Sequence, residues 1–363
     1  MPIPDPSTLD RRSFVGVSAL LCLAPAAKKL GIADQAHAKA AMDMGAMDMG
    51  GRKVAKGPAP AKDPVDALSF GTPQPQAGGS VREYWIAATS VKWNVAPTGR
   101  DDWMGMAVPR ATTFRAFAYQ LYSPGFASPL APASIPGPTL EAEVGDVIVV
   151  HLRNADKHFG DAITMHPHGV RYTPDYDGSH LGHYTRAGGF IAPGEEFKYT
   201  WECRPDSVGV WPYHDHGSNA TMNAGRGLFG AIIIREKGAP KPDVEHVLFM
   251  HSFAPPVTGL RANFECINGR AWAGNTPTLR AKVGQTVALH AIGMDSFFHT
   301  FHIHGHRWRK DGDGPSVDCT TVGPGETISA HWTEDNPGRW LYHCHVFPHQ
   351  DSGMAGWYLV DPS

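Results

Sequence analysis

The stretch "LYHCHVFPHQDSGM", residues 341–354, gathers histidines, a cysteine and a methionine at short intervals. One thiolate, two imidazoles and a weakly held thioether are the ligands of a blue-copper electron-transfer site. Cys344, His349 and Met354 supply three of these four ligands. The fourth is expected from a neighbouring strand, and His299 in "HTFHIHGH" is the candidate.

Histidines also occur in pairs separated by one residue. Side chains at positions i and i+2 of a strand point to the same face, so each pair can direct two imidazoles to one place. The pairs are His166 and His168, His214 and His216, His302 and His304, and His343 and His345. Clustered histidines of this kind predict a metal site.

Cysteine usage narrows the choice of metal. A structural zinc or iron–sulfur site would use several cysteines. Beyond the N-terminal region the chain has Cys203, Cys266, Cys319 and Cys344. With Cys344 assigned to copper, the other three allow at most one disulfide, and three pairings are open.

The elements that position these residues are repeated along the chain. "PTLEAEVGDVIVVHLRN" from Pro138 and "PTLRAKVGQTVALHAIG" from Pro277 each read as strand, turn and strand. Farther on, "MHPHGV" matches "FHIHGH", "APGEEF" matches "GPGETI", and "WPYHDHG" matches "WLYHCHV". The repetition predicts two related β-sandwich domains, residues 79–240 and 241–363.

Composition agrees with a β-rich globular protein. The 363 residues are 42% hydrophobic and include 40 glycines and 31 prolines, which favours short strands joined by turns. A net charge of −3 provides no basic field for nucleic acid. No stretch after the N-terminus is long and apolar enough to cross a bilayer, so no membrane partner is expected.

The N-terminal region predicts export. Arg11 and Arg12 precede a short apolar run and small-residue cleavage sites, which is typical of a twin-arginine-like signal over residues 1–38. The mature protein is therefore expected in the periplasm or outside the cell. Residues 39–78 are expected to form a flexible tail, in which "AMDMGAMDMGG" is either a Cu(I)-binding segment or a linker.

The motifs "HPHG", "HDHG", "HTFHIHGH" and "HCHVFPHQDSGM" together resemble the four copper motifs of the multicopper oxidases. The two-domain length resembles the bacterial small laccases. The resemblance implies an all-β fold of two cupredoxin-like Greek-key β-sandwich domains. It also implies four coppers per functional unit: type 1 on His299, Cys344, His349 and Met354; type 2 on His166 and His302; and a type 3 pair on His168, His214, His216, His304, His343 and His345.

The duplication indicates which domain holds the type 1 site. When the two repeats are aligned, the type 1 ligands of the second domain correspond to Ile163, Asp215, Ala220 and Gly225 in the first. These residues cannot form a blue-copper site. Only the second domain is therefore expected to carry one.

The implied activity is the one-electron oxidation of phenols or aromatic amines coupled to the four-electron reduction of O₂ to water. In a strand, Cys344 points away from His343 and His345, so the backbone joins the two copper centres. Oxidation of Cu(I) for copper tolerance is an alternative suggested by the Met-rich tail. A copper nitrite reductase is less favoured, because that class keeps type 1 copper in its first domain and lacks a type 3 pair. A copper-binding protein without turnover would leave the full ligand set unexplained.

The resemblance further implies a homotrimer, with each histidine cluster between the first domain of one subunit and the second domain of the next. It also suggests residues for proton delivery, namely Tyr172, Asp177 and Asp318, with Tyr176 as a competing tyrosine. His306 follows His304 at strand spacing and is expected to support the ligands rather than to bind copper.

Overall fold

Short strands with alternating burial build most of the chain. In the computed structural model, which describes residues 63–310 and 312–362, β13 (Leu279–Lys282) alternates strictly between buried and exposed side chains. By contrast, β6 (Val147–Asn154) is buried at six of its eight positions and lies between two neighbouring strands inside a sheet. The predicted signal and the Met-rich repeat lie outside the described residues.

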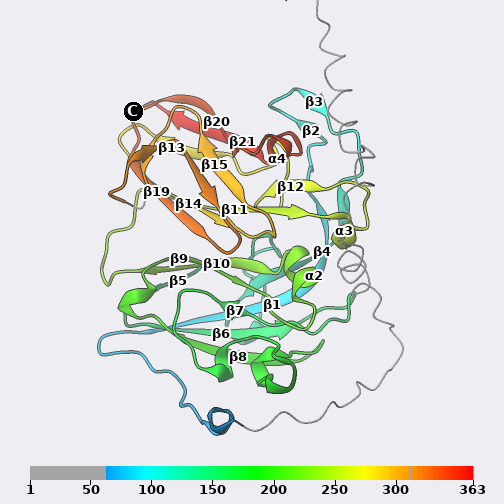
Figure 1. Ribbon diagram of the computed structural model, residues 1–363, viewed down its shortest axis with the longest axis vertical. Helices are drawn as coiled ribbons and strands as arrows, with labels where there is room; N and C mark the ends of the chain where they lie inside the picture. The colour runs from blue at the N-terminus through cyan, green and yellow to red at the C-terminus, as the bar shows by residue number, and fades with distance from the viewer. Residues whose placement is uncertain (1–62, 311, 363) are drawn as a thin grey trace, which may run out of the picture. The chain divides into compact units, whose positions relative to one another are not determined.

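The first half of the chain forms two four-stranded sheets (Figure 1). One sheet has the order β4-β1-β6-β8, with bounds Thr113–Tyr122, Val81–Asn94, Val147–Asn154 and Glu196–Glu202. The other has the order β5-β10-β9-β7, with bounds Leu140–Glu143, Phe229–Arg235, Gly209–His214 and His166–Pro167. Strands β1 and β6 pair in parallel, so the connections cross over.

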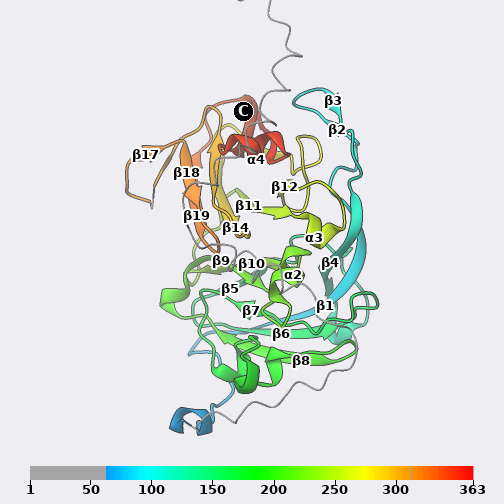
Figure 2. The ribbon, with the colours of Figure 1, turned by 45° about the vertical axis from the view of Figure 1, so that its right-hand side comes forward.

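The second half repeats this layout with one additional strand (Figures 1 and 2). Its first sheet, β12-β11-β14-β19, comprises Phe264–Ile267, Val244–Phe253, Thr286–Gly293 and Thr327–Thr333. Its second sheet, β13-β21-β20-β15-β18, comprises Leu279–Lys282, Ala355–Asp361, Gly338–Cys344, His299–Ile303 and Cys319–Val322. The predicted all-β fold of two Greek-key sandwiches is confirmed.

Smaller elements complete the described part. Two-stranded ribbons are formed by β2 and β3 (Arg100–Asp101, Met106–Ala107) and by β16 and β17 (Trp308–Arg309, Ser316–Val317). The α-helices are short: α2 (Ala220–Gly225), α3 (Pro255–Thr258) and α4 (Phe347–Asp351). None of the helices in the described residues has the length and apolar content needed to span a bilayer. The four described cysteines are free thiols, Cys203, Cys266, Cys319 and Cys344.

The duplication is visible in individual backbone hydrogen bonds. Cys203 exchanges two such bonds with the turn at 145–146, and Glu334 exchanges two with the turn at 284–285. His168 N donates to the carbonyl of Pro212, and His304 N donates to that of Leu341. These bonds identify residues of the two halves that occupy the same place in the fold.

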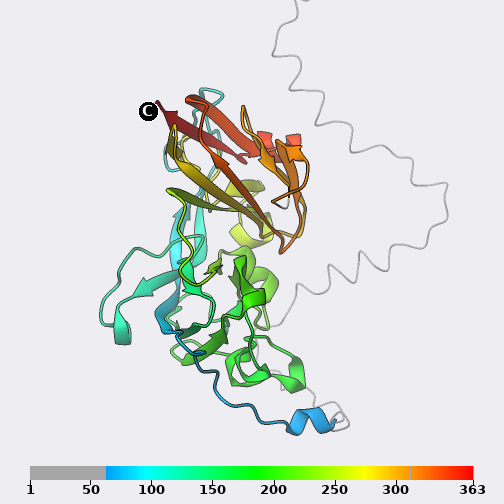
Figure 3. The same ribbon diagram turned by 90° about the vertical axis from the view of Figure 1, so that its left-hand side faces the viewer.

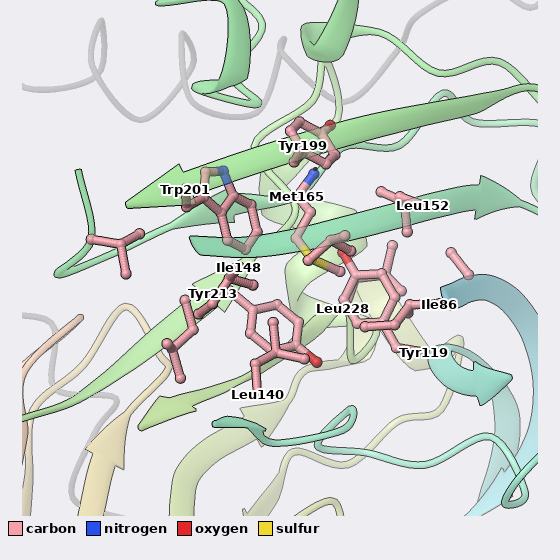
Figure 4. Close-up of a cluster of buried hydrophobic side chains, with 14 of the residues drawn as sticks. Ile86, Tyr119, Leu140, Ile148, Leu152, Met165, Tyr199, Trp201, Tyr213 and Leu228 are labelled. Carbon is pink, nitrogen blue, oxygen red and sulfur yellow. Dashed lines mark hydrogen bonds between the residues drawn. The ribbon is translucent and has the colours of Figure 1, made fainter. Parts of the chain in front are cut away.

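The largest fully buried side chains are aromatic. In the first sandwich, Tyr119, Tyr199, Trp201 and Tyr213 are fully buried between the sheets (Figure 4). The two halves are separate sets of strands (Figure 3). Both contribute side chains to one apolar cluster, in which the ring centroids of Phe229 and Phe249 are 5.0 Å apart. Each fully buried ring of this kind stabilises the fold by roughly 1.5–3 kcal/mol.

Candidate metal centres

A cysteine and two histidines meet inside the second sandwich. Neighbouring strands β15 and β20 carry His299 and Cys344, and helix α4 carries His349. The Sγ atom of Cys344 is 3.9 Å from His299 Nδ1 and 3.7 Å from His349 Nδ1, and the two nitrogens are 3.2 Å apart. Met354 is fully buried, and its backbone bonds to both Cys344 and His349. We name these four residues the sulfur centre.

The chemistry of the sulfur centre fits copper. Burial raises the pKa of the Cys344 thiol, so a cation must offset the cost of forming the thiolate. Burial also lowers the pKa of His299 to about 4 and lowers that of His349. Neutral imidazoles are the form that binds metal. The donor set is that of a blue-copper site.

A second group of histidines lies on the same two strands. His302 is paired with His343 across β15 and β20, and His304 Nε2 is 3.2 Å from His343 Nε2. His302 Nδ1 is 2.5 Å from the carbonyl oxygen of Asp318, and His343 Nδ1 is 2.9 Å from that of Cys344. These bonds leave Nε2 of both rings available for a metal.

The first sandwich repeats this group. His168 Nε2 is 3.1 Å from His214 Nε2. His166 Nδ1 is 2.7 Å from the carbonyl oxygen of Asp177, and His214 Nδ1 is 2.8 Å from that of Asp215. The same carbonyl contacts therefore orient the corresponding rings in both halves. Burial, together with the neighbouring imidazoles, lowers the pKa values of His168, His214 and His343 to about 4, and a backbone hydrogen bond opposes this shift in His214 and His343.

Each histidine group is open on one side. The rings of His216 and His345 lie within 5.8 Å of partners in their own group, yet both side chains are exposed, as is that of His304. Within the part of the chain that the structure describes, the ring contacts of these eight histidines join members of the same half. Each half therefore leaves part of its group of four imidazoles exposed.

The residues predicted for proton delivery lie beside these groups. The Asp177 carboxylate is 3.2 Å from His166 Nδ1, and the ring of Tyr172 is 5.7 Å from that of His166. Burial acts to raise the pKa of Asp177, but hydrogen bonds from His166 and Ser179 outweigh it and lower that pKa. Asp318 contacts His302 through its backbone. The hydroxyl of Tyr176 instead bonds that of Thr72.

In the first sandwich, a carboxylate occupies the place that corresponds to Cys344. Asp215 is fully buried and accepts hydrogen bonds from the backbone of Thr164 at 2.6 Å and of Gly217 at 3.2 Å. Burial raises its pKa to about 7. The other counterparts, Ile163, Ala220 and Gly225, offer no side-chain ligand atom.

Two acidic residues near the sulfur centre were not found from the sequence. Asp295 Oδ2 is 3.8 Å from His299 Nε2, and Glu265 is buried. Asp295 Oδ2, His299 Nε2 and Glu265 Oε2 are buried atoms that have no hydrogen-bond partner. Burial, together with the charge of Asp295, raises the pKa of Glu265 to about 7. Asp295 lies four residues before His299, which is a weak sequence signal for a contact between them. No nearby motif in the sequence indicates that Glu265 lies close to the site.

Two family models, both described as multicopper oxidase, match residues 130–239 and 240–363. Together they cover more than half of the chain. The chain therefore belongs to the multicopper oxidases. Its two sandwiches, with one sulfur centre within the described residues, place it among the small two-domain members of that family.

Curated relatives are larger proteins. The chain is 29% identical over 243 residues to a probable nitrite reductase–hydroxylamine oxidoreductase fusion protein of Kuenenia stuttgartiensis, covering 63% of this chain and 28% of that protein. It is 28% identical over 358 residues to hephaestin of Rattus norvegicus, covering 78% and 30%. The chain thus spans about three tenths of the length of these relatives.

Solved structures match over most of their length. A multicopper oxidase is 25% identical with a TM-score of 0.63, covering 80% of this chain and 92% of that one. A blue copper oxidase from Nitrosomonas europaea is 25% identical with a TM-score of 0.57, covering 78% and 86%. A copper nitrite reductase from the same organism shares the fold at 21% identity and a TM-score of 0.57, covering 77% and 93%.

Proposed function

We propose that this protein is a laccase-like oxidase that takes single electrons from phenols or aromatic amines and reduces O₂ to water. The observation that carries the proposal is the placement of Cys344 in the sulfur centre while its neighbours His343 and His345 belong to the histidine group. One strand thereby links an electron-accepting site to an oxygen-reducing one. When bound, copper supplies the one-electron chemistry at the first site and the oxygen chemistry at the second.

The proposed copper ligands are those expected from the motifs. Type 1 copper is assigned to the sulfur centre, and type 2 copper to His166 and His302. The type 3 pair is assigned to the other six histidines of the two groups, His168, His214, His216, His304, His343 and His345. Asp177, beside His166, is the group best placed to hold a proton, with Tyr172 next to it.

Exposed aromatic side chains support an aryl electron donor. Phe297 and Phe298 immediately precede His299, and Phe347 lies two residues before His349. All three are exposed. Apolar rings on the segments that carry type 1 ligands suit the stacking of a phenol or an aromatic amine.

A second candidate, Cu(I) oxidation, is favoured by Glu265 and Asp295. Each has a buried carboxylate oxygen without a hydrogen-bond partner, and these negative groups beside the sulfur centre could attract a cation. Soft methionines in residues 41–51 could supply Cu(I). Phenol oxidation remains the preferred function, because it requires neither feature.

Oxygen uptake distinguishes the two donors. We would compare 2,6-dimethoxyphenol with Cu(I) for the full-length protein, a form lacking residues 39–51, and the double variant Glu265→Gln, Asp295→Asn. Phenol turnover is expected to be the faster reaction and to survive both changes. Cu(I) turnover that exceeds phenol turnover, and that falls with the truncation or the double variant, would establish the second candidate instead. The variant Cys344→Ser should abolish both activities.

We further propose that the protein is exported and works as a homotrimer. The arginine pair and apolar run near the N-terminus support export. The two open histidine groups support a cluster completed between subunits. In such a trimer, the first-half group of one subunit faces the second-half group of the next.

A further inference from the structure

The turn that carries His304 is held by hydrogen bonds to two carbonyl groups, those of His304 and Gly305. The carbonyl oxygen of His304 accepts a hydrogen bond from His306 Nδ1 at 2.8 Å, and that of Gly305 accepts one from Asn336 Nδ2 at 3.1 Å. Gly305 has a φ of +73°, and a Cβ there would meet Trp340 at 2.9 Å. The backbone of an exposed ligand candidate is therefore closely constrained.

One buried carboxylate organises this turn. Glu334 Oε1 accepts from His306 Nε2 at 3.0 Å and from the backbone of Asp335 and Asn336 at 3.1 Å each. Its Oε2 accepts from Trp332 Nε1 at 2.9 Å and from the hydroxyl of Tyr358. Both ring nitrogens of His306 lie within hydrogen-bond distance of oxygen atoms, so the ring is held at both edges. A fully partnered buried network of this kind is rigid.

The corresponding positions in the first sandwich are apolar. The backbone bonds described above make His168 the counterpart of His304, and Cys203 the counterpart of Glu334. Two residues beyond His168 lies Val170, which therefore corresponds to His306. Val170 and Cys203 both belong to the buried apolar core of the first sandwich. This sandwich fold does not require a histidine and a glutamate at these positions.

We propose that Glu334 and His306 are positioning residues, which fix the turn that carries His304 and so set its ring against His343. The proposal rests on the proposed function, in which both rings hold type 3 copper. Removing the hydrogen bond between His306 and the carbonyl oxygen of His304 is expected to weaken copper binding by the histidine groups. Copper binding by the sulfur centre is expected to stay unchanged. Changes in residues that orient metal ligands typically weaken metal binding by about 10–100-fold.

The same substitution at two buried histidines tests this proposal. In His306→Gln, the amide can still donate to Glu334 but no longer to the carbonyl of His304. The matched control is His290→Gln. His290 Nδ1 is 2.8 Å from Ser329 Oγ, and its Nε2 is 3.4 Å from Glu245. It lies on β14, in the sheet that carries none of the proposed ligands.

Three quantities are measured on copper-loaded protein: the copper content per chain, the blue colour, and the rate of copper loss to a chelator. His306→Gln should stay blue but lose cluster copper about tenfold faster or more than His290→Gln. Equal retention by the two variants would overturn the proposal. If His306→Gln does not fold, the apolar pair His306→Val with Glu334→Leu replaces it with the same expectation. An unmodified protein that binds only the blue copper would contradict the proposed function itself, which is a separate outcome.

Discussion

The side chain and the backbone of Cys344 contact residues of different proposed copper sites. Its Sγ lies among the Nδ1 atoms of His299 and His349, while its carbonyl oxygen contacts His343 Nδ1. Alternation along a strand separates the thiol from the flanking imidazoles. A single residue therefore touches both proposed copper sites.

Replacing this thiol should remove the blue colour. Cys344→Ser keeps the shape of the side chain but deletes the sulfur on which the strong charge-transfer absorption of a blue-copper site depends. Visible spectroscopy of the copper-loaded variant provides the measurement. Asp215→Asn changes the counterpart residue in the first sandwich and should leave the colour unchanged. A Cys344→Ser variant that stays blue would refute the assignment.

Met354 should tune the potential of the sulfur centre rather than create it. A thioether is a weak axial donor, so Met354→Leu should raise the reduction potential and Met354→Gln should lower it, with blue colour retained in the leucine variant. A redox titration followed at the blue band measures both shifts. If neither variant shifts the potential, Met354 is not the axial ligand.

At the scale of elements, two adjacent strands supply both sites. The register of β15 and β20 places Phe301 opposite Cys344 and His302 opposite His343. A shift of one residue would turn each side chain to the other face of the sheet. Apolar residues on both strands, including Phe301 and Tyr342, are fully buried and hold this register.

A buried aspartate at the turn between β5 and β6 should stabilise the first sandwich. Asp146 accepts from the backbone of Ser80 at 2.7 Å and of Glu143 at 3.1 Å, and its partner Arg82 is 2.6 Å away. Asp146→Asn should lower the free energy of unfolding by about 1–3 kcal/mol, because buried donors lose a charged acceptor. Urea denaturation measures this change.

Arg82→Gln serves as the comparison for Asp146. The arginine side chain is 43% exposed, so solvent screens its ion pair and the loss should stay within about 1 kcal/mol. A loss as large as that of Asp146→Asn would show that the ion pair, rather than the backbone bonds, provides the stability.

For the whole molecule, the open histidine groups predict that copper retention depends on assembly. Gel filtration of the copper-loaded protein should give the mass of three chains. Mild dissociation should release cluster copper while the blue copper stays, because the sulfur centre lies within one chain. A single chain that keeps all four coppers would mean that its own two halves close the cluster.

The local sequence predicted a candidate ligand set and the half that holds the sulfur centre. Strand periodicity places residues i and i+2 on one face, and the duplication lets His302 and His304 be compared directly with His166 and His168. Both signals act over a few residues or repeat along the chain. They were sufficient to predict the all-β fold and the family.

Only the tertiary structure brought other residues to these sites. Glu265 reaches the surroundings of the sulfur centre from β12, and Glu334 reaches His306 across the fold. These contacts depend on packing between strands that are distant in sequence, so no local periodicity of the sequence predicts them. The exposure of His216, His304 and His345 was likewise decided by how each sandwich closes, because burial depends on every neighbouring strand at once.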